Sequence, residues 1–363
     1  MRLELQALQG YLDQRHGCPV QICRVNELGG GGSGEAALKQ FGYGAPLLVE
    51  YRVAEKKYQE VVHRIRRTPF GREWAADGAA AVWLDFRAFN TMPRHVPATD
   101  MLVYRRDGTL ESLHNADELL LVTRYQPGKL YAADLIRLRD GGELQPLDLA
   151  RVEILATWLA EIHQTSHDDN ALWRRRVRDL IGHGEGIMGL TDSYPTDFPL
   201  ASAERLRAIE EAANRWRWRL KPLHHRLRKV HGDLHPFNIV FAADTDFAVL
   251  DRSRGEWGEP ADDVSSLTIN YIFFSLQRDG AFAGPFRTLY DRFWTTYLAH
   301  RPDDELVRVI QPWYAWRALV VASPVWYPTI ADDVRRKLLA FGERVMEDDI
   351  YDYQHPEQYW QTQ

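Results

Sequence analysis

The stretch VHGDLHPFNIVF, residues 230–241, places two histidines, an aspartate and an asparagine between apolar runs. Aspartate and asparagine usually occupy exposed turns. Here the flanking residues, Val230 before and 239–241 after, have the β-branched and aromatic composition of buried strands. The polar residues between them therefore form a turn, a metal site or a catalytic loop; they are His231, Asp233, His235 and Asn238.

A further acidic residue follows this loop after a second apolar segment. Asp251 lies thirteen residues after Asn238, at the end of the segment DFAVLD. A hairpin-like return of the chain would bring Asp233, Asn238 and Asp251 to one rim. Asn238 and Asp251 suit Mg²⁺, which takes oxygen ligands and keeps substrate phosphates in its coordination shell. Asp233 is then available to accept the proton of an attacking hydroxyl, and this combination of groups predicts phosphoryl transfer.

The set HGD-x4-N, followed by an apolar strand and Asp, resembles the catalytic and metal-binding loops of the aminoglycoside phosphotransferase and choline kinase superfamily. The resemblance covers most of the chain and points to the small-molecule kinase branch. It implies a bilobal, protein-kinase-like fold of the α+β class, with an N-terminal antiparallel sheet lobe and a larger, mostly helical C-terminal lobe. We expect the first lobe at 1–122, a hinge at 123–129 and the second lobe at 130–363, with a substrate-binding insertion at about 165–225.

Local patterns predict the elements of the two lobes. A short helix is expected over 3–14 and a longer one over 70–89, and DLARVEILATWLAEIHQ has the apolar stripe of an amphipathic helix. An Asp-Gly turn between strand-like flanks predicts a hairpin within 100–113. ELLLVTRYQPG is expected to be a buried strand. Three further strands are predicted in PVQICRV, PLLVEYRV and YQEVVHRI.

The resemblance implies an enzyme that transfers a phosphoryl group from ATP or GTP, with Mg²⁺, to a hydroxyl of a small molecule, and it implies a nucleotide site in the first lobe. Glycines allow the close backbone approach that amide-to-phosphate contacts require. The backbone of 123–126, including Thr123 and Tyr125, would meet the adenine edge. The loop expected over the phosphates consists of Gly29, Gly30, Gly31, Gly32, Ser33 and Gly34.

The family places a phosphate-binding lysine on the third strand, and here the sequence departs from the pattern. This strand reads EVVHRIRR, so His63 or Arg64 would supply the cation. Arginine is a permanent cation with a wide fork, whereas histidine is charged only when its pKa is held up. The helix acid that pairs with this cation would be Glu73 or Asp77.

Other residues support the loop or face the acceptor. By the resemblance, Asp263, the last acid of GEPADDV, buttresses the catalytic loop, and His231 supports it by hydrogen bonding. His183 and Glu185 lie in a glycine-rich segment that fits either a substrate loop or a helix connection. Arg254 and Glu256 either reach the substrate or pair with one another.

Composition sets the broad class. The chain has 363 residues, and its net charge of -6 argues against nucleic acid as the main partner. In RWRWR, a helix with Trp on one side and Arg stems on the other is favoured over a nucleic-acid stripe. Two cysteines, Cys18 and Cys23, fit a reducing compartment. The first residues have a helical pattern unlike a secretory signal, and no apolar run reaches the roughly 18 residues of a membrane span. These features predict a cytoplasmic protein without membrane partners.

Two rival hypotheses remain at this point. HGDLH and LDRSRGE loosely resemble dinuclear metallophosphatase motifs, but the GNH or GNE element of those enzymes does not occur in the sequence. The other alternative is a catalytically degenerate kinase-like module that binds nucleotide or a partner. The missing lysine favours this alternative, whereas the joint presence of Asp233, Asn238 and Asp251 favours an enzyme.

Overall fold

The computed structural model describes residues 4–28 and 46–361, and it divides the chain into two compact units, Met1–Thr123 and Arg124–Gln363. Each unit is described here by itself. The predicted phosphate loop, Gly29 to Gly34, lies outside the described residues. The division falls inside the segment 123–129, whose role as a hinge stays a prediction.

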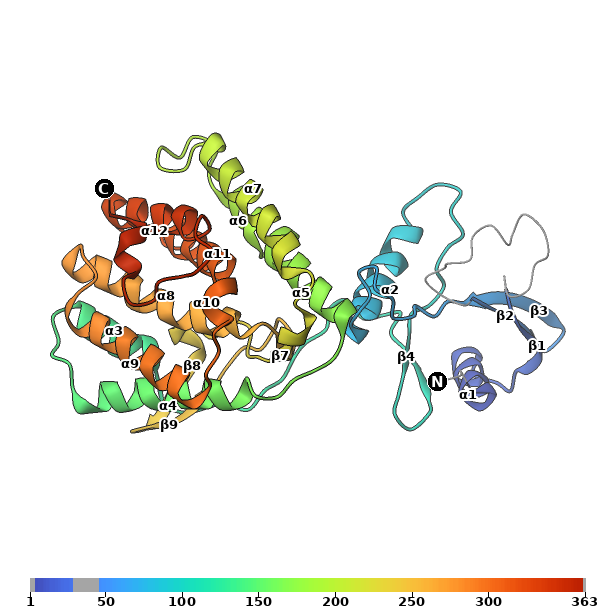
Figure 1. Cartoon of the computed structure of the whole chain (residues 1–363). Helices are drawn as coiled ribbons and strands as arrows, with labels where there is room; N and C mark the ends of the chain where they lie inside the picture. Colours follow the sequence, from blue (N-terminus) through green and yellow to red (C-terminus); the bar gives the residue numbers. More distant parts are fainter. Residues whose placement is uncertain (1–3, 29–45, 362–363) are drawn as a thin grey trace. The chain divides into compact units, whose positions relative to one another are not determined.

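The first unit is built on a three-stranded antiparallel sheet of order β1-β2-β3 (Figure 1). Alternation in β2 buries Val49 and Tyr51 on one face. Helix α1 packs its apolar stripe against that face, with Leu8 and Leu12 almost fully buried. The elements of this unit are α1 (Leu5–His16), β1 (Gln21–Glu27), β2 (Leu47–Val53), β3 (Lys56–Val62), α2 (Ala75–Phe89), β4 (Leu102–Tyr104) and β5 (Leu110–Ser112).

Two expectations for this unit were wrong. The strand predicted over 58–65 ends at Val62, so His63 follows the strand and its side chain is exposed. The segment 118–127 forms no strand, and the apolar side chains of 119–122 are exposed. A short apolar run becomes a strand only where a neighbouring strand supplies hydrogen bonds, and β5 pairs here with β4. The hairpin predicted around Asp107 and Gly108 is confirmed as β4 and β5.

The second unit is mostly helical, so the predicted α+β class, with an antiparallel sheet first and helices after it, is confirmed. Three helices, α5 to α7, occupy the predicted insertion. The helices are α3 (Tyr131–Arg139), α4 (Pro146–Ile162), α5 (Asn170–Gly182), α6 (Ile187–Ser193), α7 (Ala203–Leu220), α8 (Pro260–Asp279), α9 (Gly284–His300), α10 (Leu306–Val309), α11 (Gln311–Ala322) and α12 (Asp332–Arg344). The short 3-10 turns are η2 (His224–Arg226), η3 (Pro236–Asn238) and η4 (Pro356–Tyr359), and the strands are β6 (Lys129–Leu130), β7 (Arg228–Lys229), β8 (Ile239–Ala243), β9 (Asp246–Val249) and β10 (Trp257–Gly258).

Helix α8 is the centre of the second unit's core, since every residue from Pro260 to Leu276 is buried. Helices α9 and α11 pack against it, and α4 packs against α9. A small antiparallel sheet of order β6-β8-β9 lies beside them (Figure 1). None of the described helices combines the length and apolar composition that crossing a bilayer requires.

Candidate active site

The HGD loop leads directly into the hairpin of β8 and β9. Ile239 opposes Val249 in the antiparallel register, and the Leu250 amide donates to the Asn238 carbonyl at 2.8 Å. Asn238 and Asp251 therefore lie next to the same end of this hairpin, as the sequence predicts. Asp251 has a φ of 52°, a left-handed backbone conformation that few non-glycine residues adopt and that is common at functional sites.

The backbone of Asp233 is held from within the loop. The Asn238 side-chain amide donates to the Asp233 carbonyl at 3.0 Å, and the His235 backbone amide donates to the same oxygen at 3.0 Å. The Asp233 amide donates to Nδ1 of His231 at 3.3 Å. His235 accepts a hydrogen bond from the Phe237 amide, and burial lowers the pKa of His235, which favours its neutral form.

His231 joins the HGD loop to the strand that ends at Asp251. Because its Nδ1 accepts from the Asp233 amide, its Nε2 carries the proton and donates to the Leu250 carbonyl at 2.8 Å. The interaction fixes the tautomer and connects the two loops that carry Asp233 and Asp251.

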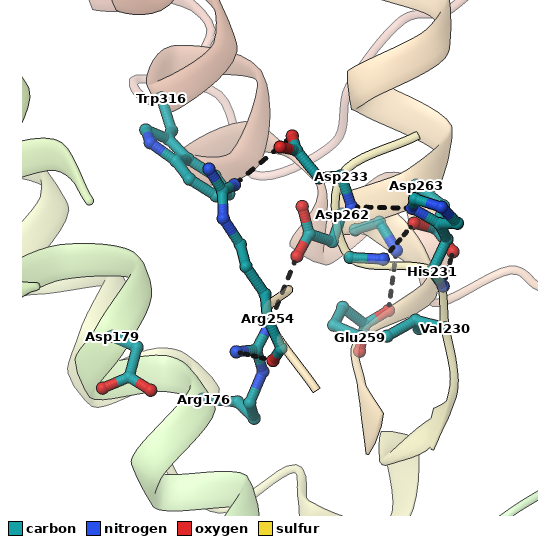
Figure 2. Close-up of polar contacts among 12 residues, drawn as sticks. Arg176, Asp179, Val230, His231, Asp233, Arg254, Glu259, Asp262, Asp263 and Trp316 are labelled. Carbon is teal, nitrogen blue, oxygen red and sulfur yellow. Dashed lines mark hydrogen bonds and ion pairs between the residues drawn. The ribbon is translucent and has the colours of Figure 1, made fainter. Parts of the chain in front are cut away.

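Asp263, in the first turn of α8, holds the same loop through its carboxylate (Figure 2). Its two carboxylate oxygens accept from the backbone amides of His231 at 2.8 Å and Gly232 at 2.7 Å. His163, at the end of α4, lies 3.1 Å from the same carboxylate and 2.8 Å from the Tyr297 hydroxyl. Burial alone would raise the pKa of Asp263, but the hydrogen bond from His163 and the nearby charges hold it below its ordinary value.

The Asp233 carboxylate faces two arginines. Nη1 of Arg317 donates to Oδ1 at 2.7 Å, and Nη1 of Arg254 lies 3.5 Å from the same oxygen. Burial alone would raise the pKa of Asp233, but these two cations outweigh it and hold the pKa below its ordinary value. Asp233 is therefore ionised at neutral pH and able to accept a proton.

Arg317 also reaches a second acid of α8. It donates to Asp262 Oδ1 at 2.5 Å and to the Gly232 carbonyl at 3.2 Å. Its guanidinium lies 3.9 Å from the ring centroid of Trp316. Figure 2 shows Asp233, Asp262 and Trp316 gathered in one place.

Arg254 connects the loop after β9 to the glycine-rich segment between α5 and α6. Its Nε donates to Glu185 at 3.3 Å, and its guanidinium lies 4.6 Å from the Trp316 ring centroid. The Glu185 carbonyl accepts from Trp316 Nε1 at 2.7 Å. The structure thus brings Glu185 to Arg254 and Arg254 to Asp233, and the role of Glu185 and Arg254 as substrate-facing residues stays a prediction.

The remaining substrate candidates lie differently. His183 is the C-cap of α5, and its Nδ1 accepts from the Glu185 amide at 3.2 Å. Glu256 is exposed and contributes its carbonyl, which accepts from the Val230 amide and from Arg252. The expected alternative of a pair between Arg254 and Glu256 is wrong, since the carboxylates that Arg254 contacts are those of Glu185 and Asp233.

The sequence from residue 50 to 303 matches the phosphotransferase enzyme family. This match spans more than half of the chain. The chain belongs to the phosphotransferase enzyme family. The resemblance read from the HGD, Asn and Asp residues is thereby confirmed.

A comparison with solved structures finds several small-molecule kinases with low TM-scores. A glucosamine kinase in complex with glucosamine, ADP and inorganic phosphate is 20% identical over 63% of this chain and 55% of its own length, with a TM-score of 0.32. The amicoumacin kinase hAmiN in complex with AMP-PNP, Ca²⁺ and Ami is 13% identical over 85% and 88%, with a TM-score of 0.40. The choline kinase LicA from Streptococcus pneumoniae is 10% identical over 94% and 99%, with a TM-score of 0.35. No curated protein is significantly similar in sequence. Membership of the phosphotransferase enzyme family rests on the sequence match alone.

The expected nucleotide-binding residues of this family member lie in or next to the first unit. Asp77 caps α2, because its carboxylate accepts from the Trp74 amide at 2.7 Å. Glu73 precedes that helix and accepts from the Gly71 amide. Arg64 follows His63 beyond the end of β3. Thr123 and Tyr125 lie outside any strand, and Tyr125 is 88% exposed.

The donor set of Asn238 and Asp251 fits Mg²⁺. The side-chain nitrogen of Asn238 donates a hydrogen bond inside the loop, which leaves the side-chain oxygen Oδ1 available as a ligand. Asp251 is exposed, and the described residues provide no hydrogen-bond or ion-pair partner for its carboxylate. No group of three or more His, Cys, Asp or Glu side chains within 4–28 and 46–361 is arranged to hold a metal. Two protein oxygens fit Mg²⁺ better than zinc, since Mg²⁺ completes its shell with water and phosphate oxygens.

Sequence reasoning missed three residues of this site: Arg317, Asp262 and His163. A signal for Arg317 was present, because the helix QPWYAWRALVVA is apolar around a single arginine. A cation in such a helix is rarely buried without a carboxylate partner. The identity of that partner requires the tertiary structure.

Proposed function

We propose that this chain transfers the γ-phosphoryl group of ATP or GTP to a hydroxyl of a small molecule, in a reaction that depends on Mg²⁺. The observation that carries the proposal is the Asp233 carboxylate, ionised and held between Arg317 and Arg254 at the end of a hairpin that also carries Asn238 and Asp251. Phosphoryl transfer depends on positioning and on charge stabilisation more than on covalent chemistry by the protein.

Asp233 acts as the proton acceptor for the hydroxyl. The hydroxyl oxygen forms a bond to the γ-phosphorus while the bond to the bridging oxygen breaks, and the nucleoside diphosphate leaves with that electron pair. The hydroxyl proton passes to Asp233. Its ionised state before the reaction follows from the lowered pKa, and the loop contacts of His231 and Asp263 fix its place.

Asn238 and Asp251 would hold Mg²⁺ through their side-chain oxygens. When bound there, the ion would supply positive charge that offsets the charge of the phosphates. On the nucleotide side, the glycine loop 29–34, the 123–126 backbone and a cation at His63 or Arg64 are proposed contacts.

The acceptor is proposed to lie against Glu185, Arg254 and the neighbouring aromatic side chains. The surface carries the negative charge of Glu185 and the positive charge of Arg254, and Arg254 also contacts the Asp233 carboxylate. This combination of charges is compatible with an amino sugar or with another hydroxylated compound. The proposed setting is a cytoplasmic one.

Turnover with a panel of acceptors tests the proposal. Wild type and Asp233→Asn are incubated with Mg²⁺, ATP or GTP, and hydroxylated amines, sugars and antibiotics, and mass spectrometry detects the phosphorylated product. We expect product from wild type with at least one acceptor, loss of that product without Mg²⁺, and a loss of about 100-fold or more in Asp233→Asn.

The control measurement is nucleotide binding by calorimetry in both proteins. Nucleotide binding without any phosphorylated acceptor would favour the binding module that has lost turnover. The absence of binding to either nucleotide would contradict the proposal altogether.

A further inference from the structure

Arg317 is a buried cation in an apolar helix. Helix α11 buries most of its residues, and Arg317 is 5% exposed among them. A guanidinium in such a place costs several kcal/mol unless carboxylates and acceptors compensate for its lost hydration. Its partners therefore show what keeps it there.

These partners are two carboxylates, one carbonyl and one aromatic face. Nη1 donates to Asp233, Nη2 donates to Asp262 and to the Gly232 carbonyl, and the guanidinium plane lies over Trp316. Asp262 is 2% exposed and also lies 3.5 Å from Arg176. Arginine suits this position, since its planar fork reaches two acids at once, which the single ammonium of lysine does not do.

The two cations act on one oxygen of Asp233. Arg317 and Arg254 both contact Oδ1, and within the described residues no hydrogen bond reaches Oδ2. The two arginines thus hold the carboxylate by Oδ1, and Oδ2 is left for an additional partner. In the proposed reaction that partner is the hydroxyl of the acceptor.

We propose that Arg317 is a positioning residue that holds Asp233 by Oδ1 and presents Oδ2 to the acceptor hydroxyl, and that Asp262 holds Arg317 in this place. The inference rests on the proposed function and adds to it which oxygen receives the proton and which residues orient it.

The second carboxylate has a specific part in this arrangement. When the hydroxyl proton moves to Oδ2, Asp233 becomes neutral and no longer balances the charge of Arg317. Asp262 Oδ1 lies 2.5 Å from Nη2 of Arg317. The buried cation therefore has a second counter-ion when Asp233 becomes neutral. An arginine between two carboxylates therefore tolerates the protonation of one of them.

The charged and titratable groups that face Asp233 come from four places in the chain. They are Arg317 on α11, Arg254 after β9, His235 in the loop itself and Tyr327 after α11. Of these four groups, Arg317 donates a hydrogen bond to the Asp233 carboxylate.

The test compares Arg317→Met, Arg317→Lys and Asp262→Asn in kcat and in KM. We expect Arg317→Met to lose about 100-fold in kcat while the KM for nucleotide stays within about threefold, because the proton acceptor is misoriented and the nucleotide is not. Arg317→Lys recovers part of kcat, and Asp262→Asn loses less than Arg317→Met.

The matched control is Arg226→Met. Arg226 is 4% exposed and also contacts several carboxylates, those of Glu259, Asp303 and Glu305, but it does not touch Asp233. This variant is expected to lose stability and to keep the wild-type kcat. An equal loss of kcat in Arg226→Met, or wild-type kcat in Arg317→Met, would overturn the inference.

A measurement without turnover separates this inference from the proposed function. Crystal structures of wild type and Arg317→Met, or Arg317→Lys if the former does not fold, compare the orientation of the Asp233 carboxylate. We expect the carboxylate to turn away from its wild-type orientation when Arg317 is replaced. An unchanged orientation overturns the role of Arg317, whereas a changed orientation with no phosphorylated acceptor in wild type leaves it standing and removes the proposed function.

Discussion

At the scale of single residues, His231 illustrates how a polar side chain in the HGD loop acts as scaffolding. It accepts from the Asp233 amide and donates to the Leu250 carbonyl, so it spans the two loops of the site. His231→Ala removes both hydrogen bonds, which lie in a partly buried place, and a polar group left without its partner costs about 1–3 kcal/mol where water does not reach it. We expect urea denaturation to show a loss of about 2 kcal/mol in this variant.

His183→Ala is the control, because the His183 side chain is exposed and replacements of this kind usually change stability by less than about 0.5 kcal/mol. Equal losses in the two variants would show that His231 does not connect the loops as described.

Asp303 makes the stability of the second unit depend on pH. Burial favours its neutral form, but hydrogen bonds and charge from Arg226 and Arg301 outweigh burial and lower the pKa of Asp303 to about 2 from the ordinary 3.8. The stabilisation is complete above the ordinary value and is lost as pH falls through the folded one, and it amounts to about 2 kcal/mol at neutral pH. We expect Asp303→Asn to be less stable than wild type by about this amount at pH 7 and by about half of it at pH 3.

Chemical denaturation at the two pH values measures this difference. A stability difference that stays constant from pH 7 to pH 3 would mean that the ionisation of Asp303 does not stabilise the folded protein.

The residues that the sequence predicted without help from the resemblance lie in one motif. Asp233, Asn238 and Asp251 fall within one loop and one hairpin, so their spacing along the chain determines their spacing in space. Arg317 lies 84 residues after Asp233, and its contact depends on how α11 packs against α8. No local pattern encodes that packing, although an arginine in an apolar helix indicates a buried partner.

At the scale of elements, β6 fixes the hairpin that carries the site. Lys129 and Leu130 pair with Phe241 and Val240 of β8. Gly128, just before β6, has a φ of 145°, and a Cβ there would lie 2.5 Å from the Phe241 carbonyl oxygen. We expect Gly128→Ala to destabilise the protein, since it adds a clash with the neighbouring strand to the backbone strain of about 1 kcal/mol.

Gly141→Ala separates these two causes. Gly141 also has a positive φ, of 98°, but a Cβ there meets no atom within 4 Å. Thermal denaturation of both variants is expected to show a clearly larger loss for Gly128→Ala. A loss of stability no larger than that of Gly141→Ala would mean that Gly128 does not pack closely against β8.

The sequence predicted hairpins better than isolated strands. An Asp-Gly pair between two strand-like segments is a local feature and predicted β4-β5, whereas β8-β9 was expected from the hairpin-like return between Asn238 and Asp251. The segment 118–127 had a strand's composition, but composition does not supply a pairing partner. Strand β3 also ends where its pairing ends, since the last pair between β2 and β3 is Leu47 with Val62, just before His63.

At the scale of the whole molecule, the two units differ in how much core they build. Most of the buried apolar side chains belong to the second unit, and within the described residues α2 contributes none. Segments with few buried contacts open with a lower free energy than core helices. We expect amide hydrogen exchange to be faster in α2 than in α8 by several orders of magnitude.

Mass spectrometry of peptides from α2 and α8 during exchange checks this prediction. Equal protection of both helices would show that the chain unfolds as one cooperative unit.

In the proposed reaction, Asp233 accepts the proton of an acceptor hydroxyl. The most direct test is the rate of phosphoryl transfer in Asp233→Asn, measured with saturating nucleotide and Mg²⁺ and with the acceptor that wild type phosphorylates fastest. We predict a loss of about 100-fold or more in kcat with nucleotide affinity within about threefold of wild type. A variant that transfers the phosphoryl group at the wild-type rate would contradict the claim.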